Sequence, residues 1–422
     1  MSQLGRSAPH GDATAGGSSG PAQRGPAALR IGIVCYPSLG GSGVIASELA
    51  VGLAQRGHRV HVIASAPPSR ALPQHDHLFF HEVAVSDYPL FEHPPYALAL
   101  AAAIVEVTSA QRLDLVHVHY AVPHAASAYL ARQVLGPAAP RIVTTLHGTD
   151  VTRVGSDPSY ESITRFTVAA SDGLTVPSDF LRRAAHRLLG LPEEPSIEVI
   201  PNFVDTDHFT PADARDRLRF NELFAAVGGE VLGADAPVLF HVSNFRPVKR
   251  MPDVVEVLAR VRQQIPARLV LVGDGPERTQ AMQRARDLGV AKSICFLGKR
   301  ADFVEYLRHA DAFVLPSESE SFGVAALEAL SAGVPVFAYR VGGLPEVVNE
   351  SVGRLVEPFD VGALAAALLD VVTDPTRHAQ LARAARAHAL AHFRHAPALE
   401  RYEAYFRRVL ARAALHSGLQ GR

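Results

Sequence analysis

Short apolar runs alternate along the chain with segments of helical periodicity, beginning at Leu29. Apolar residues three and four positions apart, as at Ile45, Leu49 and Leu53, predict helices, and short β-rich apolar runs predict strands. In the first half, strands are expected at 29–36, 59–64, 81–85, 113–119, 141–146, 173–176 and 197–200, and helices at 42–56, 96–110, 122–134, 158–170 and 178–189. This alternation predicts a mostly parallel sheet with helices on both faces.

A break separates this pattern from a second one of the same kind. Residues 201–211 are turn-rich, and 212–235 are polar and alanine-rich. Strands are then expected at 237–243, 268–273, 293–297, 312–315, 334–339 and 353–356, before a stretch of helices only at about 376–414. We therefore predict an α/β protein with two doubly wound, Rossmann-like domains, at 29–210 and 211–395, that face each other across a cleft. A C-terminal helix, 396–422, is expected to pack back on the domains.

Length and composition fit this picture. A chain of 422 residues suits two domains, and 48% hydrophobic with 20% charged residues is typical of globular proteins. The 41 basic and 42 acidic residues give no signature of nucleic-acid or membrane-surface binding. Cys35 and Cys295 lie in separate apolar segments, which indicates buried thiols in a reducing compartment.

The N-terminal segment and the length of the apolar runs bear on location. Residues 1–28 are rich in Gly, Ser, Ala and Pro and lack the apolar core of a signal peptide, so we expect a disordered extension. No uninterrupted apolar run reaches 18 residues, so no transmembrane helix is expected. These features predict a cytoplasmic protein.

Two carboxylates stand eight residues apart after the expected strand 312–315. Glu320 falls in the loop at the carboxyl end of that strand, and Glu328 lies in the helix that follows Gly323. Ligands of open α/β sheets bind at this edge. Such carboxylates can accept hydrogen bonds from vicinal hydroxyl groups, although helix-dipole stabilisation of Glu328 and simple solvation of Glu320 are the alternative explanation.

A glycine-rich loop, Gly40-Gly41-Ser42-Gly43, follows the first expected strand and opens a helix. Glycines allow close backbone approach, and the N–H groups at a helix start favour an anion. The spacing departs from the dinucleotide fingerprint, and the strand at 59–64 ends without a carboxylate, so NAD binding is disfavoured. An anion or a sugar fits better, and a plain tight turn is the alternative.

Histidines gather at the same edge of the first domain. His117 and His119 share one face of a strand, Tyr120 ends it, and His147 follows the next strand. A zinc site is conceivable, but no cluster of acidic residues accompanies the histidines. We expect His117 to be a core residue, and His119 or His147 to contact a substrate.

A basic loop follows the first strand of the second domain. Arg246, Lys249 and Arg250 fall within five residues there, enough positive charge to neutralise a diphosphate. The tight turn at Gly273 follows the next strand and suits the flank of a planar base. The pair Asp205 and Asp207 lies in the interdomain turn and is expected to cap the linker, not to hold a metal.

These motifs together resemble the retaining glycosyltransferases of family 4, which have the GT-B fold. The resemblance rests on IGIVCYPSLGGSG, VHVHYAVPHA, VTTLHGTDVT, HVSNFRPVKR, LVGDGPE and ESFGVAALEALSAGVPV, with Glu320 and Glu328 in the family's E-x7-E motif. Within the family, these segments are most similar to the bacterial enzymes that join N-acetylglucosamine from UDP-GlcNAc to L-malate at the start of bacillithiol synthesis. The sequence departs from the family where Asn244 replaces a usual arginine and Arg250 a usual glycine.

The resemblance implies roles for particular residues. It makes the first domain the acceptor-binding one and the second the nucleotide-sugar-binding one. Donor binding would involve Gly41, Gly43, Asn244, Arg246, Lys249, Gly273, Glu320, Phe322, Gly323 and Glu328. Acceptor binding would involve Ser42, Tyr120, Thr145 and Arg165, and catalysis Glu320, His147, His119 and Arg246. No metal or other cofactor is expected. A homodimer is a fair expectation.

Other chemistries stay open at this point. A family 4 transferase could use another acceptor, such as a lipid or a sugar phosphate. A UDP-GlcNAc 2-epimerase shares the fold and would consume the donor without an acceptor. A non-catalytic nucleotide-sugar binding module is disfavoured by the intact carboxylate pair and basic loop.

Overall fold

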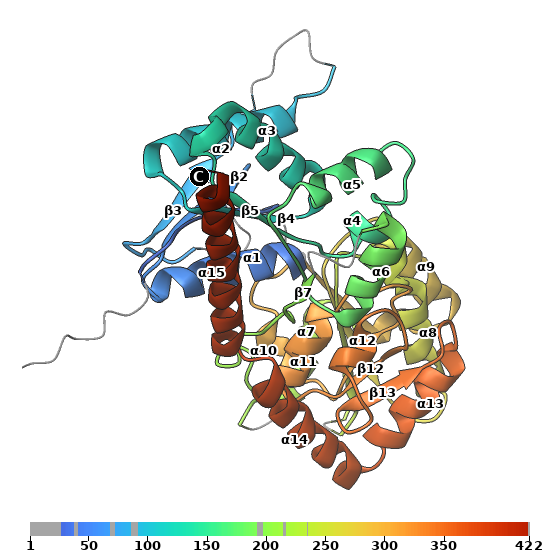
Figure 1. Ribbon diagram of the computed structural model, residues 1–422. Helices are drawn as coiled ribbons and strands as arrows, with labels where there is room; N and C mark the ends of the chain where they lie inside the picture. Colours follow the sequence, from blue (N-terminus) through green and yellow to red (C-terminus); the bar gives the residue numbers. More distant parts are fainter. Residues whose placement is uncertain are drawn as a thin grey trace, which may run out of the picture.

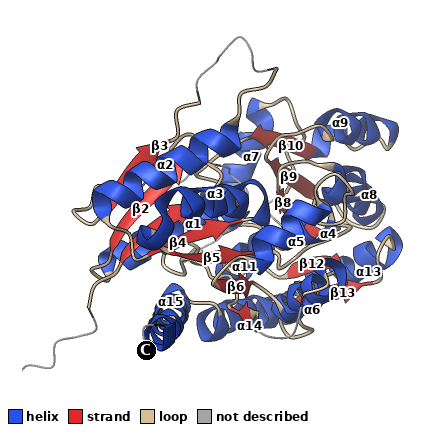
Figure 2. Ribbon diagram, turned by 45° about the horizontal axis from the view of Figure 1, so that its top comes forward, coloured by secondary structure: helices blue, strands red, loops and turns tan. Residues whose placement is uncertain are grey.

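The chain folds into two parallel β-sheets, one of seven strands and one of six, each covered by helices (Figures 1 and 2). The computed structural model describes residues 27–37, 41–67, 72–85, 92–191, 197–213, 217–233 and 235–420. The two doubly wound α/β domains predicted from the sequence are confirmed. Nearly all of the predicted extension 1–28, and Gly40 of the glycine-rich loop, lie outside the described residues.

The N-terminal sheet has the strand order β3-β2-β1-β4-β5-β6-β7, with all neighbours parallel. Its strands are β1 (Arg30–Val34), β2 (Arg59–Ala64), β3 (Leu78–Glu82), β4 (Leu115–His119), β5 (Arg141–Thr145), β6 (Gly173–Val176) and β7 (Glu198–Val199). The strand order reverses between β1 and β4. In doubly wound sheets, ligands bind outside the carboxyl ends of the strands at such a switch point.

Helices cover both faces of this sheet because its strands are apolar on both sides. The helices of this half are α1 (Gly41–Gln55), α2 (Tyr96–Gln111), α3 (Ala126–Leu135), α4 (Thr149–Thr152), α5 (Glu161–Ala169) and α6 (Asp179–Leu189). Ile45, Leu49 and Leu53 of α1 are fully buried, as their spacing predicts. The N-cap Ser178 accepts a hydrogen bond from the Leu181 N–H and starts α6.

The C-terminal sheet repeats the design with the order β10-β9-β8-β11-β12-β13. Its strands are β8 (Val238–Val242), β9 (Arg268–Val272), β10 (Ile294–Gly298), β11 (Ala312–Leu315), β12 (Val336–Tyr339) and β13 (Gly353–Val356). The helices are α7 (Arg217–Ala226), α8 (Met251–Arg262), α9 (Arg278–Asp287), α10 (Val304–Leu307), α11 (Val324–Ser331), α12 (Leu344–Val347), α13 (Val361–Val372) and α14 (Pro375–His392). One core layer forms under α8, α9 and α13, and the other under α7, α11 and α14.

The last helix, α15 (His395–Gln420), returns to the N-terminal domain (Figure 1). Tyr402 and Phe406 are buried in the same cluster as Ile45 and Leu49 of α1. The Tyr405 hydroxyl accepts a hydrogen bond from the Leu174 N–H and donates one to the Leu174 carbonyl, at 2.7 and 3.0 Å. The end of the chain therefore completes the core of the first domain.

Two sequence predictions differ from the structure. The strand expected at 81–85 lies three residues earlier, at β3, where it pairs with β2 from Leu78 onward. The stretch 212–235, expected to be a polar break, contains α7, whose Phe220 and Phe224 are fully buried. These two rings, four residues apart, form an apolar stripe that the surrounding polar and alanine residues obscure.

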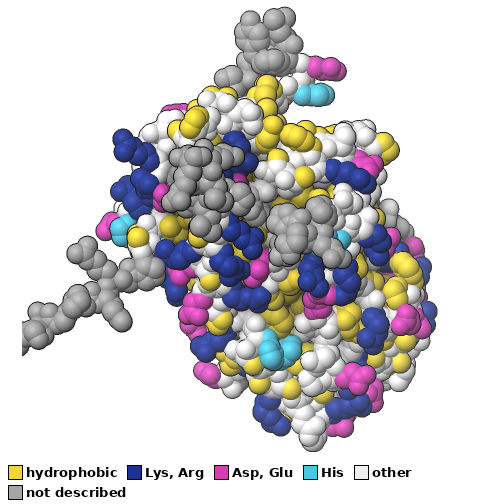
Figure 3. All heavy atoms as spheres, viewed as in Figure 1, with side chains coloured by type: hydrophobic (Ala, Val, Ile, Leu, Met, Phe, Trp, Pro, Cys, Tyr) yellow, Lys and Arg dark blue, Asp and Glu magenta, His cyan; other side chains and the backbone are white. Residues whose placement is uncertain are grey.

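Acidic and basic side chains are interspersed on the face shown in Figure 3. This mixture matches the near-equal numbers of basic and acidic residues in the sequence, 41 and 42. None of the described helices combines the length and the apolar character that a membrane crossing requires.

Candidate active site

A cavity of about 180 Å³ lies between the two domains, at the carboxyl ends of their strands. The N-terminal domain contributes the loop and helix after β5 and the start of α6. The C-terminal domain contributes the loop after β8 and the loop after β11. The lining residues are His147, Gly148, Thr149, Thr152, Arg153, Phe180, Leu181, Asn244, Arg246, Val248, Lys249, Ser319, Glu320 and Ser321.

A larger hollow, of about 490 Å³, lies at the opposite edge of the N-terminal sheet. Two of its charged side chains, Arg30 and Asp114, form an ion pair with each other at 2.9 Å. The smaller, interdomain cavity is instead lined by five of the polar residues predicted to carry chemistry: His147, Asn244, Arg246, Lys249 and Glu320.

The basic loop and the first carboxylate meet directly in the interdomain cavity. The Lys249 ammonium donates to Glu320 Oε1 at 2.5 Å, and the buried Ser317 hydroxyl donates to the same oxygen at 2.9 Å. Among the described residues, no carboxylate pairs with the Arg246 guanidinium, which is exposed at the cavity wall. Of these two cations of the basic loop, Lys249 is thus neutralised and Arg246 is available to an anion.

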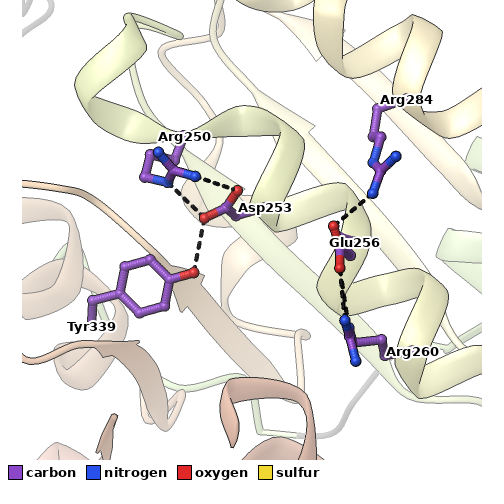
Figure 4. A network of polar contacts seen from close by, with 6 residues as sticks. All are labelled: Arg250, Asp253, Glu256, Arg260, Arg284 and Tyr339. Carbon is purple, nitrogen blue, oxygen red and sulfur yellow. Dashed lines mark hydrogen bonds and ion pairs between the residues drawn. The ribbon is translucent and has the colours of Figure 1, made fainter. Parts of the chain in front are cut away.

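Arg250 does not enter the cavity lining, although it is the third cation of the loop. It has a positive φ of 50° and forms a two-pronged ion pair with Asp253, at 2.6 and 3.0 Å (Figure 4). The Tyr339 hydroxyl donates to the same carboxylate at 2.8 Å. Arg250 therefore ties the end of the basic loop to α8 and β12.

Backbone contacts fix the position of Glu320. The Gly343 N–H donates to the Glu320 carbonyl at 2.9 Å. A side chain at Gly342, whose φ is 57°, would collide with the same carbonyl. On the other side of the sheet edge, Gly273 has a φ of 122°, and a side chain there would collide with the Ser243 carbonyl. The absence of a side chain at Gly273 thus allows the start of the basic loop, at Ser243, to pack directly against it.

The remaining predicted donor residues differ in accessibility. Glu328 lies in α11 and is 7% exposed. Phe322 is 2% exposed and packs against Phe393 in the core, so its side chain does not face the cavity. This leaves only the backbone of Phe322 to contact a ligand, as a donor-binding role for this residue would require. Gly323 is the N-cap residue of α11.

The start of α1 forms the wall of the N-terminal domain opposite α11. Gly41 is exposed there and lies close to Val324, whereas Gly43 is buried inside the first turn. The Ser42 and Tyr120 hydroxyl groups are 2.8 Å apart. Burial raises the pKa of Tyr120 to about 12, so this phenol stays protonated at neutral pH.

His147 lines the cavity, and His119 lies behind it without any exposed surface. His119 Nδ1 and His147 Nε2 are 2.8 Å apart. His117 is buried too, as expected, with its Nε2 at 2.6 Å from the Thr145 hydroxyl. The structure therefore separates the two candidates for substrate contact: only His147 is placed to touch a ligand.

Asp150 holds the His147 loop and was not singled out from the sequence. Its Oδ1 accepts from the His147 and Gly148 N–H groups at 3.0 and 2.9 Å, and its Oδ2 from the Ala121 N–H. Burial raises the pKa of this carboxyl to about 6, against the opposing effect of these hydrogen bonds. The sequence signal that could have identified Asp150 is its position three residues after His147, in the segment His147-Gly-Thr-Asp150.

None of the four predicted acceptor residues is in the cavity lining, and two of them, Thr145 and Arg165, have side chains that are engaged elsewhere. The Thr145 side chain is 1% exposed, and its hydroxyl is bonded to His117 and Thr175 on the face that α15 covers. Arg165 lies on the exposed face of α5, paired with Glu161 and directed to the Leu188 carbonyl. In this geometry neither side chain reaches the cavity. Arg153, which lines the cavity, was missed because neither its spacing nor a motif marked it.

The structure also bears on metal binding. Asp205 Oδ1 accepts from the Asp207 and His208 N–H groups, both at 3.0 Å, so the Asp205 carboxylate caps the turn of the linker. Within the described part of the chain, no group of three or more His, Cys, Asp or Glu residues is arranged to hold a metal ion. The zinc hypothesis for the histidines therefore gains no support.

Three contacts join the two domains beside the cavity. The Ser178 hydroxyl donates to the Ser321 carbonyl at 2.6 Å. The Glu346 carboxylate, on α12, accepts from the Asp179 and Phe180 N–H groups at 2.9 and 2.8 Å. The loop that carries Glu320 is thereby held against the start of α6.

Comparison with known proteins places this arrangement in a family. Residues 39–208 match the family model described as Glycosyltransferase Family 4, and residues 229–388 match the model described as Glycosyl transferases group 1. The chain is 40% identical over 384 residues to the N-acetyl-alpha-D-glucosaminyl L-malate synthase of Bacillus anthracis, with 90% of this chain and 97% of that protein covered. The chain belongs to glycosyltransferase family 4.

Other relatives of this family 4 glycosyltransferase act on different molecules. The D-inositol 3-phosphate glycosyltransferase of Saccharomonospora viridis is 33% identical, with 83% of this chain and 85% of that protein covered.

Among solved structures, HepE of Anabaena in complex with UDP-glucose aligns with a TM-score of 0.73 at 21% identity, covering 91% of this chain and 99% of that one. The sucrose-phosphate synthase of Thermosynechococcus elongatus gives 0.71 at 22% identity, with 91% and 99% covered. The likeness to these structures confirms the GT-B fold.

Proposed function

We propose that this glycosyltransferase moves N-acetylglucosamine from UDP-GlcNAc to the hydroxyl group of L-malate, with retention of configuration, as the first step of bacillithiol synthesis. The observation that carries the proposal is the 40% identity along 97% of the length of the Bacillus anthracis enzyme, whose name states both the sugar and the acceptor. UDP as the nucleotide is favoured by HepE, which has the same fold and was solved with UDP-glucose.

The charges at the cavity suit a nucleotide-sugar donor. The Arg246 guanidinium neutralises part of the charge of the diphosphate. The Lys249 ammonium leaves Glu320 and neutralises the rest. Glu328 accepts hydrogen bonds from the ribose hydroxyls, and Glu320 accepts them from the sugar. In the free protein Lys249 and Glu320 hold each other at 2.5 Å, so neither charge is left unpaired before the donor binds.

The reaction itself is a substitution at the anomeric carbon of the sugar. The malate hydroxyl oxygen forms a bond to that carbon, and the bond from the carbon to the diphosphate oxygen breaks. The departing phosphate oxygen takes the malate hydroxyl proton, on the same face of the ring, which retains the configuration. Negative charge develops on the diphosphate as the bond breaks, and Arg246 and Lys249 are placed to stabilise it. We propose that no metal ion is needed for this step.

The dicarboxylate acceptor needs hydrogen-bond donors and positive charge. We place one carboxylate at the start of α1, where Ser42, Tyr120 and the free N–H groups of the first turn lie together. Arg153, at the end of α4 on the cavity wall, supplies a positive charge on the acceptor side in place of Arg165. Closure of the domains over both substrates excludes water and limits hydrolysis.

Product analysis tests the proposal. The purified protein is incubated with UDP-GlcNAc and L-malate, and the product is identified by mass spectrometry and by the proton NMR signal of its anomeric centre. The expected product is a malate glycoside in the α configuration. A β-glycoside would contradict retention, and conversion of the donor to a 2-epimer without malate would replace the proposal by the epimerase function.

The expected homodimer and the cytoplasmic location stay predictions. Size-exclusion chromatography with light scattering measures the first.

A further inference from the structure

Four histidines meet at the end of β4, behind the cavity wall. His117 and His119 belong to β4, His124 to the turn that follows, and His147 to the loop after β5. The first three have no exposed surface. The rings of His117 and His119 are 4.5 Å apart, and those of His119 and His147 are nearly parallel at 5.0 Å. Of the four, only His147 lines the cavity.

The link between His119 and His147 requires one ring to donate and the other to accept. Burial lowers the pKa of His147 to about 3 and that of His119 well below its usual range, so both imidazoles are neutral at pH 7. A neutral imidazole carries one N–H group and one bare nitrogen. The 2.8 Å contact from His119 Nδ1 to His147 Nε2 therefore contains a single proton.

The surroundings of His119 decide which ring carries that proton. The other nitrogen of His119, Nε2, is buried and has no hydrogen-bond partner among the described residues. An N–H group left unpaired in the interior is rarer than an unpaired acceptor, because it costs more free energy. His119 therefore carries its proton on Nδ1 and donates it to His147 Nε2.

The same logic fixes the tautomer of His147. Since its Nε2 accepts from His119, its own proton lies on Nδ1, the nitrogen for which the described residues provide no partner. His147 then offers an N–H group to the cavity instead of a bare nitrogen. A sugar hydroxyl can accept from that group and keep its own proton for a bond to a carboxylate.

We propose that His119 is a positioning residue: it donates from Nδ1 to His147 and so holds His147 in the tautomer that presents an N–H donor to a hydroxyl of the donor sugar. The sugar contact rests on the proposed function. The tautomer itself does not, so the two can fail separately.

Nitrogen NMR of protein labelled with ¹⁵N-histidine tests the tautomer. The signals of His147 are identified by their loss in His147→Gln. We expect a protonated Nδ1 and a bare Nε2 in the wild-type protein. The opposite assignment would overturn the proposal, whatever the substrates are.

Two substitutions of His119 then separate positioning from mere packing. Asparagine can place an amide N–H near the position of Nδ1, whereas leucine has no donor. We expect His119→Leu to lose the fixed tautomer in the NMR signals and to lower kcat by about tenfold, the net worth of one hydrogen bond, while UDP affinity is unchanged. His119→Asn should restore the tautomer and most of kcat. Equal losses in both variants, with the wild-type tautomer retained, would show that His119 only fills space; if His119→Leu does not fold, the wild-type and His119→Asn spectra still decide.

Discussion

Replacement of Glu346 by alanine should weaken the contact between the two domains. Its carboxylate accepts from the Asp179 and Phe180 N–H groups at 2.9 and 2.8 Å, across the domain boundary. A carboxylate that caps the start of a helix is worth about 1 kcal/mol, and up to about 2 kcal/mol. Glu346 is exposed, which keeps the value in the lower part of that range. The third contact, from Ser178 to Ser321, remains in the variant.

A loss of about 1 kcal/mol, at the lower end of that range, corresponds to a shift of about fivefold away from the arrangement in which the two domains are in contact. We expect Glu346→Ala to lower kcat/KM for sugar transfer by that factor and to raise the radius of gyration measured by small-angle X-ray scattering. Glu350→Ala is the matched control, because Glu350 is an exposed acid of the same domain, four residues away. If both variants match the wild-type protein in rate and radius, Glu346 does not hold the domains together and this reasoning is wrong.

Three further substitutions test other parts of the structure. Arg250→Gly should be more stable than Arg250→Ala by about 1 kcal/mol in urea unfolding, because glycine alone is unstrained at the φ of 50° seen there; equal stability would contradict the backbone conformation. Burial lowers the pKa of His117 in the folded protein to about 3. Below pH 6.5 His117 therefore takes up a proton only in the unfolded chain, and the free energy of unfolding falls with falling pH by about 1.4 kcal/mol per pH unit. His117→Phe should remove that share of the slope between pH 6.5 and pH 5, and an unchanged slope would mean that another group causes it. Glu328→Gln should weaken UDP binding about tenfold in calorimetry by loss of charged hydrogen bonds to the ribose, and unchanged affinity would remove Glu328 from the donor site.

Local patterns of apolar and polar residues predicted most of the strands and helices. The strands β2, β6, β11 and β13 begin and end where the apolar runs do, because each run is bounded by turn residues or charges. The helix α7 was missed because its two buried rings stand among polar and alanine residues, and only the packing of Phe220 and Phe224 into the C-terminal core reveals it. Periodicity therefore identifies elements whose apolar face is broad, and misses a short helix such as α7, where Leu223 packs partly buried beside the two rings.

The sequence predicted which strand ends carry the residues of the candidate site, but not which of their side chains reach the cavity. Strand ends placed His119, His147, Arg246 and Glu320 near one cleft, since parallel strands present their carboxyl ends together. Which of these side chains reaches the cavity depends on what covers each face. Helix α15, which arrives from the far end of the chain, buries the face that holds Thr145.

Contacts across the domain boundary depend on how the two domains are oriented. No local pattern in the sequence marks such a contact. One example is the contact of Glu346 with α6. Another feature that depends on the domain orientation is the position of Arg153 at the cavity wall.

The most direct test of the proposed function is the release of UDP from UDP-GlcNAc, measured with and without L-malate and with EDTA present throughout. We expect rapid release that depends on malate and is unaffected by the chelator. Release that is equally fast without malate, or none in its presence, would contradict malate as the acceptor, and release abolished by EDTA would contradict a transfer step that needs no metal.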